Sequence, residues 1–134
     1  MIYGIGTDLV NSKRVERLIN KFGNKFLLKI FSNEEINNSK SSFNKAHYFS
    51  KKFAGKEAFW KAMSPNRENT LYFNEIEILS NENGKPYVNL IGRTKNRLSD
   101  LEKSLNCKFN FHISISDEKP NALAFVIIFL AHLD

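Results

Sequence analysis

The sequence contains little cysteine, proline or glycine: one Cys, three Pro and six Gly occur among 134 residues. The lone thiol, Cys107, cannot close an intramolecular disulfide and lacks the spacing of a zinc site, which excludes a disulfide scaffold and indicates a reducing compartment. The strongest apolar run, residues 122–131, is shorter than the roughly 20 residues of a membrane-spanning helix. The first residues show no secretory signal, so we expect a cytoplasmic protein without a membrane partner.

Neither an internal repeat nor a linker divides the chain, and a 42% hydrophobic composition is sufficient for one sizeable core. We therefore expect a single domain over residues 1–134. The net charge of +6 predicts attraction to something anionic. On charge alone the partner could be nucleic acid, an acidic protein, a polyphosphate or a membrane surface.

Hydrophobic periodicity predicts a mixture of strands and helices. The polar segment 33–45 shows no clear pattern and could be a loop, a polar helix or a mixture. The order of the elements predicts an α+β fold, with a mostly antiparallel sheet packed on a long central helix. The expected strands are 1–10, 73–79, 87–91, 108–116 and 123–129, and the expected helices lie between 11 and 23, between 24 and 32, at 46–63 and at 94–105.

The first strand ends in an acid on a face that is nearly bare of side chains. Alternation puts Asp8 on the same face as Gly4 and Gly6, opposite Tyr3 and Ile5. The bare face would let an anion or a metal-bound phosphate approach the backbone, and it would equally let a helix pack closely. Taken alone, Asp8 is better explained by close helix packing and a local hydrogen bond.

A second acid, Glu57, lies in the middle of the long predicted helix, with Lys61 one turn further on. By itself this is an ordinary Glu-to-Lys helix pair. The two acids together say more, because Mg²⁺ takes one or two protein carboxylates and fills its remaining positions with water and substrate phosphate oxygens. Lys52, Lys56 and Lys61 could then contact a phosphate-rich ligand, although three lysines on one helix are more often a solvated surface.

The penultimate strand carries a histidine on its polar face. His112 alternates with Phe111 and Ile113 and shares its face with Ser114 and Ser116. A histidine in a strand is usually structural, and no second histidine or cysteine has the spacing of a zinc ligand. The more specific alternative is that His112 contacts a phosphate of a ligand.

Three segments, in this order along the chain, resemble the holo-acyl-carrier-protein synthases: GIGTDLV at 4–10, FAGKEAFWKA at 53–62 and HISISD at 112–117. Gly84-Lys85-Pro86, Arg14 and the alanine-rich last strand also fit that family, so the resemblance spans nearly the whole chain. It implies a single-domain, magnesium-dependent phosphopantetheinyl transferase. Such an enzyme moves phosphopantetheine from coenzyme A onto a serine of apo-acyl carrier protein, for fatty acid biosynthesis.

The resemblance also implies roles for individual residues. Asp8 and Glu57 would ligate Mg²⁺ and act catalytically together with Lys61, which would contact the phosphates of coenzyme A. The carrier serine would attack the β-phosphate, adenosine bisphosphate would leave, and Glu57, directly or through a metal-bound water, would be the base. Family members are typically homotrimers with each site between neighbouring subunits, and we expect the same assembly here.

Arg14, Lys52, Lys61 and His112 would, by the same resemblance, hold coenzyme A. Lysine at position 52 stands where an arginine is common, and it lacks the bidentate fork of a guanidinium. The segment 63–66 replaces a glycine-containing turn, so we expect no particular nucleotide contact from it.

The first predicted helix carries a row of basic residues, because Lys13, Arg17 and Lys21 recur at four-residue spacing. With Arg14 they would form a surface for an acidic carrier protein, and we expect Arg14, Arg17 and Lys21 to bind it. A solvated outer surface explains any single one of these residues equally well.

The main competing function is a small basic nucleic-acid-binding module, in which lysines and aromatic residues on a sheet contact phosphates and bases. It explains the charge. It does not explain Asp8 and Glu57, because a phosphate-binding surface gains nothing from unpaired acids. A catalytically inactive interaction subunit is a third possibility, and it requires that neither metal nor coenzyme A binds. We therefore expect coenzyme A and acyl carrier protein, and not nucleic acid, as partners.

Overall fold

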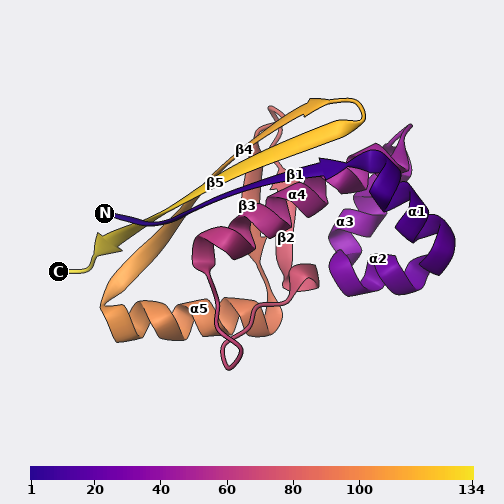
Figure 1. The fold of residues 1–134 in the computed structure, drawn as a ribbon. Coiled ribbons are helices and arrows are strands. Elements are labelled where there is room, and N and C mark those ends of the chain that lie inside the picture. Colours follow the sequence, from indigo (N-terminus) through magenta and orange to yellow (C-terminus); the bar gives the residue numbers. More distant parts are fainter.

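In the computed structural model, which describes residues 1–134, a three-stranded antiparallel sheet lies along one side of a long helix (Figure 1). The strand order is β1 (Ile2–Asn11), β5 (Asn121–His132) and β4 (Cys107–Glu118), with β5 in the centre. The helix is α4, which spans Lys45–Met63. The expected α+β fold with a mostly antiparallel sheet on a central helix is confirmed.

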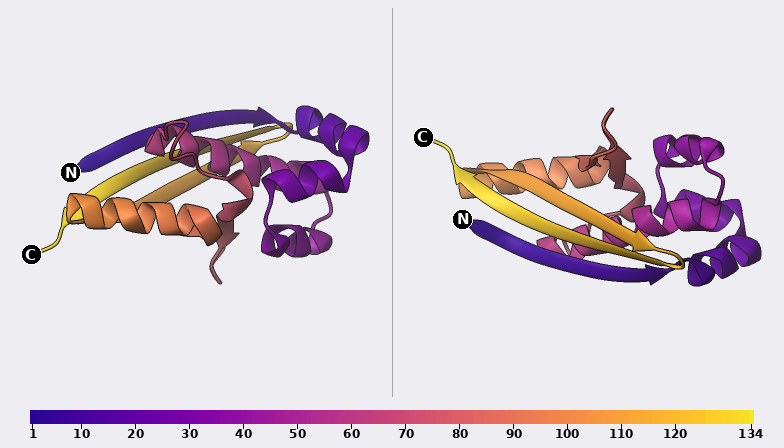
Figure 2. Two further views of the ribbon diagram at one scale, coloured as in Figure 1. Left: turned by 90° about the horizontal axis from the view of Figure 1, so that it is seen from below. Right: turned by 90° about the horizontal axis from the view of Figure 1, so that it is seen from above.

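The remaining elements surround α4. Helices α1 to α3 gather near its N-terminal end, the hairpin β2–β3 lies beside its middle, and α5 lies on the far side from α1 (Figures 1 and 2). No helix is both long and apolar enough to cross a bilayer. The bounds are α1 Ser12–Phe22, α2 Asn24–Ile30, α3 Asn33–Asn38, β2 Ile76–Ser80, β3 Pro86–Leu90 and α5 Gly92–Leu105, with 3₁₀ turns at Ser39–Ser41 and Phe73–Glu75.

Local signals in the sequence account for most element ends. The side chain of Asn11 accepts a hydrogen bond from the Lys13 backbone N–H at 2.9 Å and so caps α1, which ends at Gly23. Helix α4 ends as predicted, because Ser64 takes a left-handed conformation immediately before Pro65. The unassigned segment 33–45 is a mixture of a short helix, a 3₁₀ turn and the start of α4.

The inner face of the sheet packs so closely on α4 that the backbones of β1 and α4 are in contact. A Cβ on Gly4 would lie 1.8 Å from the carbonyl oxygen of Ala62, and one on Gly6 would lie 1.9 Å from that of Ala58. No side chain fits in that space, so these positions require glycine. The bare face of β1 is therefore filled by α4, which confirms the helix-packing interpretation and excludes the direct approach of an anion to Gly4 and Gly6.

The outer face of the same sheet is covered by no other element (Figure 2, right). The strand register places Ile5 opposite Ile127, and Ile127 opposite His112, so these three side chains share that face. Large apolar side chains stay exposed there, including Leu9 at 63% and Phe125 at 37%. Exposed apolar side chains gathered along β1 and β5 in this way are typical of an interface.

Tyr3 does not lie on the outer face, contrary to the prediction from strand alternation. The register of β1 shifts between Ile2 and Gly4. A shift of this kind interrupts the two-residue alternation and moves a side chain to the other face. The Tyr3 ring consequently packs edge-on against Phe109, with 5.1 Å between ring centroids.

Candidate active site

Asp8 and Lys61 meet at the end of β1 and the C-terminal half of α4. The Lys61 ammonium lies 3.2 Å from Asp8 Oδ1 and donates to the backbone carbonyl of Thr7 at 2.9 Å. The contact of α4 with Gly4 and Gly6 holds the helix against the strand, so a lysine on α4 reaches the last inward-facing acid of β1. The Asp8 side chain is only 10% exposed, whereas that of Lys61 is 56% exposed.

Glu57 completes this cluster from the preceding turn of α4, close enough to Asp8 for that carboxylate to raise its pKa. Arg14, in the first turn of α1, lies 3.7 Å from Glu57 Oε1. The Arg14 guanidinium also lies over the Phe53 ring, at 5.4 Å from the centroid. Because α1 directly follows β1 and packs beside α4, the chain brings Arg14 to Glu57 on that helix. Four of the predicted residues, Asp8, Arg14, Glu57 and Lys61, are thus brought together.

The electrostatics of the cluster leave negative charge incompletely balanced. Burial, and after it the neighbouring Asp8 carboxylate, raise the pKa of Glu57 to about 7 against the opposing effects of Arg14 and Lys61. Asp8 Oδ2 is buried and has no hydrogen-bond partner. A buried carboxylate oxygen without a donor is costly, so this atom is suited to face a cation.

These donors fit a magnesium ion. No group of three or more His, Cys, Asp or Glu side chains could enclose a metal, so a cation here would have two carboxylate ligands, and substrate and water would supply the rest. That donor set is typical of Mg²⁺ bound together with a phosphate-containing substrate. It is unsuited to zinc, which prefers nitrogen and sulfur ligands.

His112 and Lys52 lie apart from the cluster within one chain. The register puts His112 on the outer face of the sheet, where its ring packs edge-on against Phe129, whereas Asp8 lies on the inner face. Lys52 lies on another side of α4, with its ammonium 5.1 Å from the Tyr48 ring centroid. Burial lowers the pKa of Lys52.

Lys52 lines a basic pocket of about 270 Å³ near the β2–β3 turn. Gly84 and Pro86, from the segment that resembles the family motif, lie at one side of this pocket, and Lys51 contributes a second cation. Asp117 at the rim pairs with His47, whose Nε2 lies 2.7 Å from Asp117 Oδ2. The pocket could hold an anionic ligand with the two lysines.

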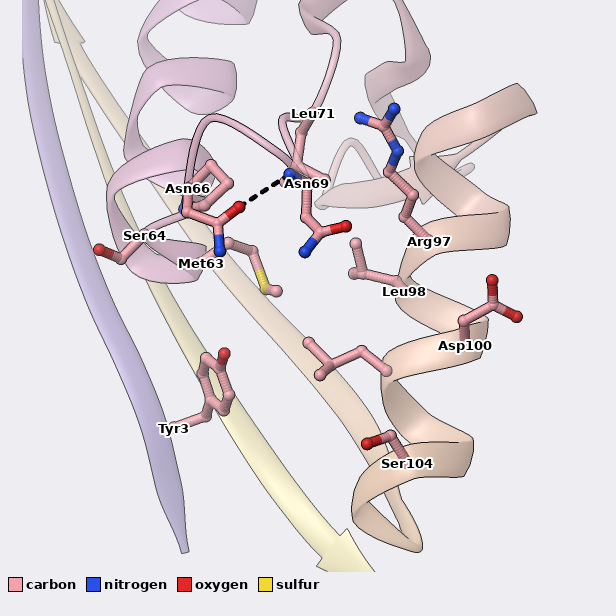
Figure 3. Close-up of a pocket in the computed structure, with 12 residues that line it drawn as sticks. Tyr3, Met63, Ser64, Asn66, Asn69, Leu71, Arg97, Leu98, Asp100 and Ser104 are labelled. Atoms are coloured by element: carbon pink, nitrogen blue, oxygen red, sulfur yellow. Dashed lines mark hydrogen bonds between the residues drawn. The ribbon is translucent and has the colours of Figure 1, made fainter.

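A separate cavity of about 390 Å³ lies between the chain after α4 and helix α5 (Figure 3). Met63, Leu71 and Leu98 form its apolar wall, and Tyr3 points toward it from β1. None of the residues of the acidic cluster lines this cavity.

Of the predicted carrier-binding residues, Arg17 and Lys21 lie on the exposed side of α1, whereas Arg14 lies against Glu57 and Phe53 of α4. Arg17 and Lys21 face solvent, away from the buried Val15. Beside them, between α1 and α2, lies an apolar groove of about 280 Å³. Its lining residues are Leu18, Phe22, Lys25, Phe26, Lys29 and Ile30.

The prediction that Lys56 could contact a phosphate is wrong. Lys56 is completely buried, and its ammonium lies 2.6 Å from Glu35 Oε1, which is also completely buried. Sequence reasoning gave Glu35 no role. Its one local signal was the pattern Ser32-x-x-Glu35, which forms a capping box at the start of α3.

Comparison with known proteins agrees with this geometry. Residues 4–124 match the model of the 4′-phosphopantetheinyl transferase superfamily. The holo-[acyl-carrier-protein] synthase of Wolbachia pipientis is 41% identical, over 96% of this chain and 98% of that protein. The structure of that enzyme from Neisseria meningitidis is 36% identical, with a TM-score of 0.83 over 96% of this chain and 99% of its own. One from Bacillus anthracis, in complex with CoA (3′,5′-ADP), is 27% identical, with a TM-score of 0.74 and 96% of each chain covered. The chain therefore belongs to the 4′-phosphopantetheinyl transferase superfamily and, within it, to the holo-[acyl-carrier-protein] synthases.

Proposed function

We propose that this protein is an enzyme that transfers phosphopantetheine from coenzyme A to a serine of apo-acyl carrier protein. It acts as one domain over residues 1–134, in the cytoplasm, and supplies the holo-carrier for fatty acid biosynthesis. The observation that carries the proposal is that Asp8, Glu57 and Lys61 lie together and that one oxygen of Asp8, Oδ2, is buried without a hydrogen-bond partner. An acid pair with an adjacent lysine is suited to phosphoryl transfer, in which positioning and charge neutralisation provide most of the catalysis.

Asp8 and Glu57 would hold Mg²⁺. The unpartnered Asp8 Oδ2 and the raised pKa of Glu57 both indicate that Lys61 and Arg14 do not fully balance the two acids, which suits a further cation there. Bound there, the ion would neutralise negative charge on the diphosphate oxygens of coenzyme A.

The side chains of the cluster account for the proton and the leaving group. Glu57, beside Asp8 in the cluster, accepts the proton of the carrier serine hydroxyl as the general base. The serine oxygen forms a bond to the β-phosphorus, and the bond to adenosine 3′,5′-bisphosphate breaks. Lys61 donates to the departing phosphate and stabilises its charge, and Arg14 adds a second cation beside Glu57.

The direct test is the mass of an apo-carrier protein after incubation with the enzyme, coenzyme A and Mg²⁺. We expect a gain of one phosphopantetheine. Asp8→Asn and Glu57→Gln should each lower the rate by at least about 100-fold with unchanged circular dichroism. The exposed Glu16→Gln on α1 is the matched control and should retain full activity. A wild-type rate for either cluster variant would contradict the metal assignment, and nucleic acid retained in a gel shift without any mass gain would favour the competing module.

The uncovered sheet face supports a homotrimer with sites between subunits. His112 cannot reach Asp8 within one chain, because the two side chains lie on opposite faces of the sheet. A neighbouring copy that packs on the outer face and over the edge strand β1 would bury Leu9 and Phe125, and it would bring its own His112 to Asp8 past that edge. Contacts between different surfaces of identical chains close into a ring of three when each contact turns the next chain by about 120°.

Mixing two inactive variants tests the shared site. Asp8→Asn chains supply an intact His112, and His112→Ala chains supply an intact Asp8. If each site combines two chains, random mixing restores both residues at about a quarter of the interfaces. Activity of the mixture no higher than that of the separate variants would contradict a shared site, as would a monomeric mass in light scattering.

The basic pocket around Lys52 would hold the nucleotide end of coenzyme A. Lys51 and Lys52 provide charge for a phosphate, and Tyr48 provides an aromatic surface. Lys52→Met should raise the KM for coenzyme A about tenfold with a smaller change in kcat, because the lost contact is remote from the reacting phosphorus. Lys40→Met, at an exposed position, is the control.

The exposed side of α1 would bind the acidic carrier. Its basic row would attract the carrier, and the apolar groove beside Phe22 would accept an apolar side chain from it. Charge reversal of Arg17 and Lys21 to Glu should raise the carrier KM at least about tenfold at low salt. The matched charge reversal of Lys95 and Lys103 on α5 should leave the carrier KM unchanged. An unchanged carrier KM in the Arg17 and Lys21 variant would contradict this binding surface.

A further inference from the structure

The buried pair of Lys56 and Glu35 is the largest charged feature that the proposed reaction does not use. Both side chains are 0% exposed, and their charged atoms lie 2.6 Å apart. The Lys56 ammonium also donates to the carbonyl oxygens of Phe73, at 2.8 Å, and Ile76, at 2.5 Å. An ammonium has three hydrogens to donate, so all three are used, and the direction of the side chain is fixed.

Glu35 extends the pair into two further elements. Its Oε1 accepts the backbone N–H of Ser32 at 2.9 Å, and its Oε2 accepts that of Ile78 at 2.9 Å. Ser32 in turn donates to Glu77 at 2.6 Å. The middle of α4 is thereby tied to the start of α3 and to strand β2.

Stability alone does not account for such a pair. A buried ion pair is usually no more stabilising than apolar side chains of the same volume, because both charges lose their hydration. What the pair adds is direction, since each atom has a defined partner. On the opposite side of α4, Gly4 and Gly6 of β1 present no side chains that could set the rotation of the helix, and the directional contact to Thr7 and Asp8 comes from the half-exposed Lys61.

Rotation of α4 matters because Lys56 and Glu57 are consecutive. Their side chains are separated by about 100° around the helix axis. A turn that releases Lys56 from its acceptors therefore moves Glu57 relative to Asp8, which belongs to a different element. We propose that the Lys56–Glu35 pair is a positioning device that holds Glu57 beside Asp8 and thereby sets the affinity of this site for a divalent cation. This inference rests on the proposed function, and Lys56 and Glu35 are positioning residues that touch neither substrate nor ion.

The test measures cation binding separately from activity, with Mn²⁺ as the probe and its electron paramagnetic resonance signal as the readout. Lys56→Met combined with Glu35→Gln removes both charges of the pair together, and the neighbouring buried Glu77 keeps its hydrogen bonds from Ser32 and Asn89. We expect this variant to stay folded and to bind Mn²⁺ about 10- to 100-fold more weakly, as when groups that orient metal ligands are lost. Leu98→Val, which weakens a buried contact of α5, controls for lost stability and should bind Mn²⁺ like the wild type.

A second variant keeps the inference testable if the double variant fails to fold. Glu35→Asp preserves both charges but draws the carboxylate back by one methylene, so we expect an intermediate loss of Mn²⁺ affinity. Wild-type affinity in either folded variant would overturn the inference. A wild-type protein that binds no Mn²⁺, or an Asp8→Asn variant that binds it equally well, would instead refute the proposed metal site.

Discussion

Magnesium binding to this enzyme should depend on pH, because the cluster must release a proton to accept the ion. Burial raises the pKa of Glu57 to about 7, from 4.5 for an ordinary glutamate. A metal ligand must be deprotonated, so below that pKa each pH unit weakens the apparent affinity by close to tenfold. Between pH 8 and pH 6 the apparent dissociation constant for Mg²⁺ should therefore rise about tenfold.

Isothermal titration calorimetry in buffers of different ionisation enthalpy measures the dissociation constant for Mg²⁺ and the number of protons released on binding. At pH 6 about 0.9 proton should be released per ion, and at pH 8 about 0.1. Glu57→Gln cannot release this proton, so its weaker binding should be nearly independent of pH in the same range. Equal affinity and no proton release at pH 6 and pH 8 in the wild type would refute the reasoning.

The same shift has a consequence for the metal-free protein. Because the folded-state pKa of Glu57 lies above the unfolded value, the folded state holds this proton more tightly. Its contribution to stability is fully present below about pH 4.5 and is lost as the pH rises through about 7. The melting temperature of the wild type should thus fall relative to that of Glu57→Gln across this window, and an unchanged difference would contradict the assignment.

Two further predictions concern the scaffold. Gly6→Ala would place a Cβ 1.9 Å from the carbonyl oxygen of Ala58. The substitution should therefore lower the free energy of unfolding in urea by at least about 2 kcal/mol and abolish transfer. Wild-type stability would show that α4 can move away from β1. Glu75→Ala removes the acceptor for the backbone N–H groups of Arg93 and Thr94 at the start of α5. It should lower the free energy of unfolding by about 1–2 kcal/mol without loss of activity. Thermal unfolding and a transfer assay check the two expectations.

Most elements could be predicted because their signals are local. Caps and periodicity gave α1 and α4, and alternation placed His112 and Asp8 on definite faces of their strands. Tyr3 was misplaced because a shift in register depends on pairing with β5, which the residues around it do not reveal. Whether His112 could reach Asp8 depended on the order of the strands, which alternation within one strand cannot supply.

The misjudged Lys56 shows a different limit. Lysines at positions 52, 56 and 61 look alike in the sequence, yet one lines a pocket, one is fully buried and one faces Asp8. Burial of Lys56 is favourable only because Glu35, which lies 21 residues earlier, is there to pair with it. Glu35 itself belongs to a short polar segment without periodicity, so only its contacts in the fold reveal its role.

The exposed apolar face of the sheet would make the activity of the enzyme depend on its concentration. If the neighbouring copy completes each site, free subunits are inactive, and the specific activity of the enzyme falls on dilution below the dissociation constant of the assembly. A cell could then silence the enzyme simply by making less of it, with no inhibitor and no change in any side chain.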